Sequence, residues 1–152
     1  MNSDDPTRSP LLTPTRILTA LGLFVAVLGG AVFVAWLAAP RTVTLEITQP
    51  VGKTVVCHVV VDGRPESHRA VAPVTFRFAA KELRYAVVCL DASPPADVTV
   101  LVRDRAGTGG VRTGAGVKGS YRAAWWGTHA QFEAMTPTHV ATMRSSATAE
   151  PL

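Results

Sequence analysis

TVTLEIT at residues 42–48 and TVVCHVVVDG at residues 54–63 decide the fold class. In the first segment Val43, Leu45 and Ile47 alternate with polar residues, which is the pattern of a half-buried β-strand. The second segment is β-branched almost throughout and ends in Asp-Gly, a dipeptide that favours a tight turn. The two segments therefore predict two β-strands, the second of which runs into a turn.

Further segments carry the same alternation of apolar and polar residues. They span residues 74–78, 83–90 and 98–103. A last strand is expected at residues 120–126. Short strands at regular spacing, with turn residues between them, indicate a sandwich or a barrel. We therefore predict a mainly β fold, in which residues 42–126 form a small antiparallel β-sandwich.

The glycine-rich segment GTGGVRTGAGVKG, residues 107–119, carries almost no apolar side chains. This composition predicts a mobile loop that tolerates substitution. Residues 114–119 match the pattern G-x-G-x-x-G of dinucleotide-binding turns, but too few residues follow for the helix that this motif needs. We expect no nucleotide there, and the sequence predicts no cofactor.

Residues 127–152 are expected to lie outside the sandwich. THAQ at residues 128–131 fits a helix capping box, and Phe132 and Met135 are available for one apolar face. This pattern predicts a helix of at most two turns. Residues 136–152 are rich in Thr, Ala and Ser, a composition that favours disorder.

Residues 17–39, ILTALGLFVAVLGGAVFVAWLAA, carry no charge. A helix needs about 20 apolar residues to cross the hydrocarbon core of a bilayer, so this run predicts a single transmembrane helix. The alternative is a cleaved signal peptide, whose hydrophobic region is usually about 7 to 15 residues long. Trp36 and Leu37 are also bulky where a cleavage site needs small residues. We therefore expect the helix to stay in the mature protein as a signal anchor.

The orientation in the membrane rests on the order of the segments. Residues 1–16 have the composition of a flexible tail and include Arg8 and Arg16. Arg41 and Lys53 follow the helix, so the count of positive charges on its two sides is tied. A short leader before a long β-rich domain favours a cytoplasmic N-terminus and an extracytoplasmic domain at the cell membrane.

The charge pattern bears on the partners of the domain. The net charge is +4, but the arginines are scattered without a basic helix or run. Nucleic-acid binders concentrate basic residues on one face, so we expect no nucleic-acid partner. A mildly basic exported domain instead suits the anionic headgroups of a lipid bilayer.

Small residues recur along the predicted transmembrane helix. Gly22, Ala26 and Gly30 lie four residues apart and therefore share one helix face. Such a face lets a second helix approach closely, which predicts a homodimer through the membrane helix. The alternative is the ordinary abundance of Gly and Ala in membrane helices.

Cys57 and Cys89 are the only cysteines, and each shares a strand face with apolar residues. Small domains in oxidising compartments commonly pair two such residues, so we predict a Cys57–Cys89 disulfide. The alternative is two unbonded cysteines that act as small buried hydrophobes. The histidines are dispersed and no Cys-x2-Cys pair occurs, so no metal site is predicted.

Trp125 and Trp126 are adjacent, so on a strand they face opposite sides, and both can be buried only if both faces are covered. An exposed tryptophan beside Tyr121 suits a contact with a partner protein. The alternative is an aromatic residue that fills the end of a small core. For catalysis, no Ser or Cys with a His and an acid, and no pair of carboxylates, stands out, so we expect a non-enzymatic protein.

Two short segments resemble known families. Residues 57–63, CHVVVDG, followed by VCL at residues 88–90, resemble the Cys-x4-Asp-Gly to Cys-Leu segment of mycobacterial small membrane proteins of the MmpS kind. That resemblance implies a single-pass protein with a β-sandwich outside the membrane, acting as an accessory to lipid and siderophore exporters. Residues 60–65, 73–78 and 85–88 are similar to the PEGA repeat, a small surface β module used for interaction.

These observations predict a membrane-anchored accessory or interaction protein with an envelope or transport complex as its partner. The alternative is an extracytoplasmic carrier that binds a lipid or another apolar ligand between its sheets. A sizeable apolar cavity would favour the carrier, and a solid core would favour the interaction protein.

Overall fold

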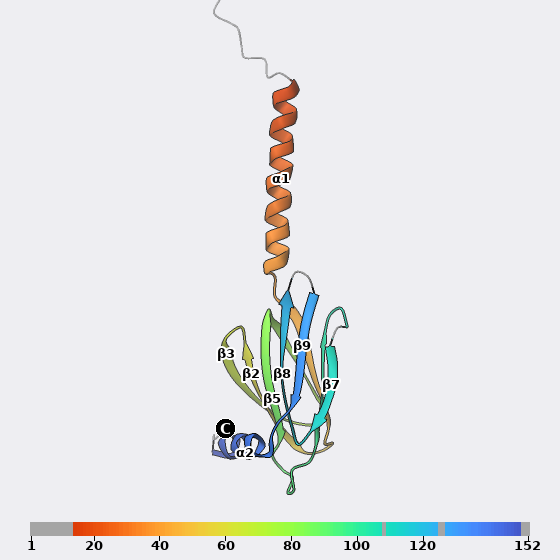
Figure 1. Cartoon of the computed structure of the whole chain (residues 1–152), viewed down its shortest axis with the longest axis vertical. Helices are drawn as coiled ribbons and strands as arrows, with labels where there is room; N and C mark the ends of the chain where they lie inside the picture. Colours follow the sequence, from red (N-terminus) through yellow and green to blue (C-terminus); the bar gives the residue numbers. More distant parts are fainter. Residues whose placement is uncertain (1–13, 108, 125–126, 150–152) are drawn as a thin grey trace, which may run out of the picture. The chain divides into compact units, whose positions relative to one another are not determined.

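The computed structural model describes residues 14–107, 109–124 and 127–149. The chain divides into two units, Met1–Ala38 and Ala39–Leu152. The described part of the first unit is the helix α1 (Pro14–Ala38) (Figure 1). Its 21-residue segment Ile17–Leu37 has a mean hydropathy of 2.5 and is not buried by the rest of the protein. By length and composition, α1 is able to cross a membrane.

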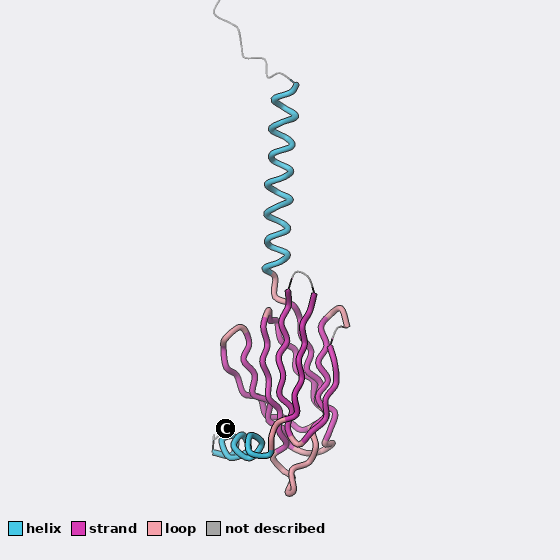
Figure 2. The backbone as a smooth tube through the Cα atoms, in the orientation of Figure 1, coloured by secondary structure: helices cyan, strands magenta, loops and turns pink. Residues whose placement is uncertain are grey.

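The second unit is mainly β and contains two antiparallel sheets (Figures 1 and 2). Sheet A has the strand order β4-β1-β6-β7, and sheet B has the order β3-β2-β5-β8-β9. The strands are β1 (Arg41–Gln49), β2 (Thr54–Val61), β3 (Arg64–Val71), β4 (Val74–Ala80), β5 (Glu82–Cys89), β6 (Val98–Asp104), β7 (Gly109–Gly114), β8 (Gly116–Ala124) and β9 (Gly127–Ala134). A second helix, α2 (Pro137–Ala149), follows β9.

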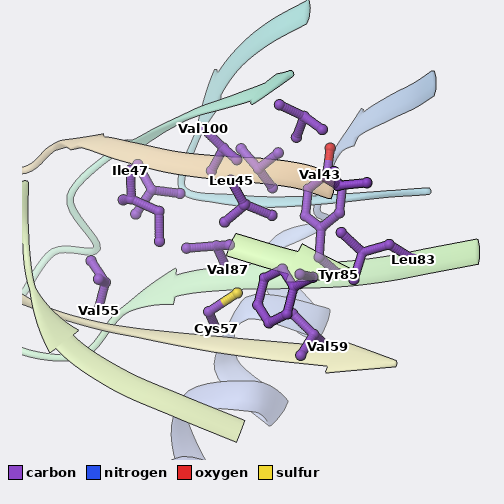
Figure 3. Close-up of a cluster of buried hydrophobic side chains, with 14 of the residues drawn as sticks. Val43, Leu45, Ile47, Val55, Cys57, Val59, Leu83, Tyr85, Val87 and Val100 are labelled. Carbon is purple, nitrogen blue, oxygen red and sulfur yellow. The ribbon is translucent and has the colours of Figure 1, made fainter. Parts of the chain in front are cut away.

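One hydrophobic core joins the two sheets, and the alternation in the sequence explains it. In β1, Val43, Leu45 and Ile47 are fully buried, while the residues between them are not. The same cluster takes in Val55 and Val59 of β2, together with residues of β4, β5, β6 and β8 (Figure 3). Because alternate residues of a strand face the same side, each sheet gives one apolar face to this shared core. The arrangement is sandwich-like.

The predicted turn at Asp62-Gly63 joins β2 to β3. Both residues have positive φ angles, 47° and 84°, as the tight turns of two-residue hairpins require. The Asp62 side chain also accepts hydrogen bonds from the backbone N–H groups of Lys81 and Glu82, at 2.9 and 2.8 Å. The turn therefore holds the start of β5 as well as closing the hairpin.

The predicted loop at residues 107–119 is wrong, because most of this segment is strand. β7 pairs with β6, and β8 pairs with β5 on one side and β9 on the other. The glycines of residues 107–119 permit close packing between strands as well as turns. A Cβ on Gly110 would lie 2.7 Å from the ring of Phe132 in β9. The predicted tolerance to substitution is therefore also wrong at such positions.

The predicted C-terminal boundary of the sandwich, at residue 126, is wrong too. The segment expected as a capping box and short helix is the strand β9, where Ala130, Phe132 and Ala134 pair with the inward residues of β8. Most of the segment expected to be disordered is α2. Its start fits the rules for helix ends, with Pro137 at the first position and the Thr136 hydroxyl accepting from the His139 N–H at 3.4 Å.

The predicted disulfide is wrong, although the predicted burial of both cysteines is right. Cys57 and Cys89 are unbonded, and each is no more than 1% exposed. In the register of β2 and β5, Cys57 lies opposite Val87 and Cys89 lies opposite Val55. Diagonal neighbours of this kind are about 7 to 8 Å apart at Cα, which is beyond the usual disulfide span. Burial also raises the pKa of the Cys57 thiol to about 12, so it stays protonated at neutral pH.

Candidate interaction groove

The outer face of sheet B is divided between a covered part and an open part. Side chains that point outward form rows across its strands, because paired residues of neighbouring strands point to the same side. The first row contains Val56, Val88 and Gly116, and α2 packs on it through Val140 and Ala147. Val88 is fully buried by this packing, although it lies on the face opposite the core.

Hydrogen bonds from two arginine side chains hold α2 in place. Arg144 of α2 donates to the carbonyl oxygens of Leu90 and Ala92 at 2.9 and 2.6 Å. Arg69 of β3 donates to the carbonyl oxygen of Ala147, near the end of the helix, at 2.6 Å. Because Val140 lies against β8 and Ala147 lies at β3, α2 runs across the strands (Figure 1).

The next two rows are left open and form a groove, here named the sheet B groove. The second row contains His58, Ala86, Lys118 and Glu133, and the third contains Val60, Arg84, Ser120 and Gln131. The groove has a volume of about 890 Å³. This size lies within the range of about 300 to 1,000 Å³ that is usual for binding pockets.

Small side chains between longer ones make this face concave. Ala86 on β5 lies between His58 and Lys118 of the neighbouring strands. Ser120 on β8 likewise lies between Arg84 and Gln131. The centre of the groove is therefore lower than its borders, and its floor is built from the rigid inner strands of sheet B.

Polar contacts within and beside the groove are those of a solvated surface. Lys118 forms an ion pair with Glu133 at 3.2 Å, and Arg84 forms one with Glu82 at 3.0 Å. Exposed pairs of this kind contribute only about 0.2 to 1 kcal/mol, so a partner can replace them at little cost. His58 Nδ1 lies 2.6 Å from the Ser67 hydroxyl, which fixes the imidazole at the border of the groove.

Of the residues predicted to contact a partner, only Tyr121 lies in the described part of the chain. Tyr121 is fully buried in the core, so its predicted role as a partner contact is wrong. Its hydroxyl donates to Asp104 at 3.5 Å, and the hydroxyl of Thr128 donates to the same carboxylate at 2.8 Å. Trp125 and Trp126 lie outside the described residues. Tyr121 is therefore part of a polar cluster that links β6, β8 and β9.

Gly22, Ala26 and Gly30 are exposed on α1. A Cβ placed on either glycine would meet nothing within 4 Å, which leaves room for a neighbouring helix. The predicted homodimer contact through these residues stays a prediction.

The groove residues were missed in the sequence. Arg84, Ala86 and Ser120 fall in segments predicted as strands, but Lys118 is recognisable as an outward-facing strand residue only after 107–119 is read as strand. Their juxtaposition depends on the register between β5 and β8, which a single sequence does not contain. The sequence feature that could have revealed the strand is the alternation of apolar or small residues with polar ones in residues 116–124.

Within residues 14–107, 109–124 and 127–149, no group of three His, Cys, Asp or Glu side chains is placed to hold a metal ion. Comparisons with protein-family models, with curated proteins and with solved structures found no match.

Proposed function

We propose that this chain is a non-enzymatic, membrane-anchored interaction protein, whose β domain binds a protein of an envelope or transport complex through the sheet B groove. The observation that supports the proposal best is the unequal covering of one sheet face. α2 covers the first row of outward side chains, and the two rows beside it form an open hollow on a rigid floor. A partner seated there would meet a hollow floored by Ala86 and Ser120 and bordered by polar side chains.

The carrier of a lipid or other apolar ligand is the weaker candidate. Its ligand was expected between the two sheets, and that space is occupied by the shared core (Figure 3). Core side chains from both sheets, among them Leu45, Val87 and Val100, are fully buried. A ligand between the sheets would have to displace them.

The membrane anchor is part of the same proposal. α1 spans the bilayer as a signal anchor, with the N-terminus in the cytoplasm and the β domain outside. The support is its length, its hydropathy and its lack of burial within the protein. The two weak resemblances, to MmpS-like small membrane proteins and to PEGA modules, agree with an extracytoplasmic interaction domain.

Retention of α1 is the first expected result. The intact mass of the protein extracted from membranes should include residues 17–39, because this apolar run is longer than the hydrophobic region of a cleaved signal peptide. A carbonate wash should leave the chain in the membrane fraction, as a spanning helix requires. A mature species that begins after residue 31 would contradict the anchor.

The groove is tested by site-specific crosslinking in the full-length chain. A photoreactive amino acid at Ala86 should capture one discrete protein in the membranes of cells that produce the chain, because Ala86 lies at the centre of the groove. Leu101 is the matched control position, since it is also half-buried and lies on the outer face of sheet A. Equal capture at both positions, or none at Ala86, would refute the groove as the binding site.

A further inference from the structure

We infer that one end of the β domain binds the anionic headgroups of the bilayer in which α1 is anchored. This inference rests on the membrane anchor of the proposed function and adds the binding surface and the lipid class. The surface, here named the basic end, is the end at which β1 begins and β4 stops, since Arg41 pairs with Ala80. The turn after β2 and the last residues of β6 and β8 lie at the same end, because β2 and β8 pair with β5 and β6 pairs with β1.

The basic end carries most of the cations of the domain that have no partner of their own. Five Lys and Arg side chains there form neither an ion pair nor a hydrogen bond with another described residue: Arg41, Arg64, Lys81, Arg105 and Arg122. Four of them are exposed, and Arg41 is half-buried. In the rest of the described domain, the cations without such a partner are Lys53, Arg77 and Arg112.

The acids at the basic end are already bound within the domain. Asp62 accepts hydrogen bonds from the backbone N–H groups of Lys81 and Glu82, at 2.9 and 2.8 Å. Glu82 forms its ion pair with Arg84 at 3.0 Å. Asp104 is only 8% exposed and accepts a hydrogen bond from the Thr128 hydroxyl. The unpaired cations at this end are therefore left for an anion from outside the domain.

The opposite end of the sandwich differs in charge and in cover. Lys53, in the turn before β2, is accompanied there by Asp91 and Asp97, in the segment between β5 and β6. α2 packs on the adjoining part of sheet B, where Arg144 donates to carbonyl oxygens of the segment after β5. The unpaired positive charge of the domain is thus concentrated at one end.

The place of the basic end in the chain identifies the anion that covers it. Only Ala39 and Pro40 separate the end of α1 from the start of β1. Consecutive Cα atoms are about 3.8 Å apart, so this link spans at most about 11 Å. With α1 across the bilayer, Arg41 is held close to the headgroups, where a Lys or Arg is attracted to anionic lipid within a Debye length of about 8 Å. A separate acidic protein has no such link to this end.

The test measures which lipids surround the full-length chain in vesicles of mixed phosphatidylcholine and phosphatidylglycerol. A fluorescent donor is attached through Ala79→Cys, an exposed position of β4 next to the basic end, and Cys57 and Cys89 stay unlabelled because they are buried. Energy acceptors are carried on the acyl chains of either lipid. Transfer should show about fivefold enrichment of phosphatidylglycerol over phosphatidylcholine, the preference expected of one cation engaged with a headgroup.

Two triple variants of equal net charge separate the basic end from the rest of the domain. Lys81→Gln/Arg105→Gln/Arg122→Gln should lower the enrichment to less than about twofold, because most of the exposed cations of the basic end are gone. The control replaces the three unpaired cations outside the basic end with Gln, and it should keep the wild-type enrichment. High salt should reduce the enrichment around the wild type, since it screens exposed charges.

Equal enrichment around the two triple variants, or none around the wild type, would overturn the inference. Carbonate washing and intact mass separate this failure from failure of the anchor. Loss of residues 17–39 from the mature chain overturns the anchor and the inference together, whereas an anchored chain without a lipid preference overturns the inference alone. A basic-end variant that keeps its lipid but loses the protein captured at Ala86 would show that these cations contact a protein, which also refutes the inference.

Discussion

Gly119→Ala should lower the free energy of unfolding of the β domain by about 3 kcal/mol, the upper end of the usual cost of overpacking. Gly119 lies opposite Tyr85 across β5 and β8. A Cβ on this glycine would overlap the Tyr85 hydroxyl and the backbone carbonyl oxygen of Gln131. The tyrosine is buried and the carbonyl belongs to the sheet, so neither is free to move away. Chemical denaturation of the full-length chain measures the effect.

Two controls make the Gly119 result specific. Ser120→Ala introduces the same residue one position along β8 on the outer face, and it should change stability by less than about 0.5 kcal/mol. Gly119→Ala in a Tyr85→Phe background should recover part of the loss, because one of the two overlapping atoms is gone. If Gly119→Ala unfolds at the wild-type denaturant concentration, the close packing between β5 and β8 is refuted.

Tyr121→Ala should destabilise the domain by about 3 to 5 kcal/mol, as removal of a buried aromatic side chain usually does. Tyr121 is fully buried and contacts Asp104, which itself is only 8% exposed. Burial raises the pKa of the Tyr121 hydroxyl, so it remains a protonated donor at neutral pH. Tyr121→Phe keeps the ring and should cost only about 1 kcal/mol.

Stability and partner capture should be measured together in both Tyr121 variants. The Phe variant should keep capture through the crosslinker at Ala86, because the groove lies on the other face of sheet B. An Ala variant of full stability that loses capture would restore Tyr121 as a contact residue and contradict its place in the core.

The sequence predicted the strands whose own alternation is strong. Residues 42–48 and 83–89 were placed correctly because apolar residues at every second position have one way to be buried in a sheet, and residues 54–61 because β-branched residues favour strands. The prediction failed at residues 107–119, because the glycines were interpreted as evidence for a loop. Two of these glycines, Gly110 and Gly119, make room for Phe132 and Tyr85 of other strands. A local pattern does not contain such distant pairs.

The strand β9 was predicted wrongly as a short helix for a different reason. The sequence from Gly127 to Ala134 carries both a capping box and an alternation of small or apolar residues with His129, Gln131 and Glu133. The alternation prevailed because β8 offers a full set of backbone partners, which adds more than one cap does. The groove depends on this same strand, so it too was beyond local patterns.

The free edges of the sheets determine how this domain behaves when it is concentrated. The strands β3, β4, β7 and β9 all end their sheets, and β7 and β9 lie close to each other at Gly110 and Phe132. β3 carries Pro65 and several charges, which discourage pairing with a strand of another molecule. In β4, VTFRFAA, Arg77 is the only charged residue that opposes such pairing. Aggregation at high concentration should therefore begin at β4.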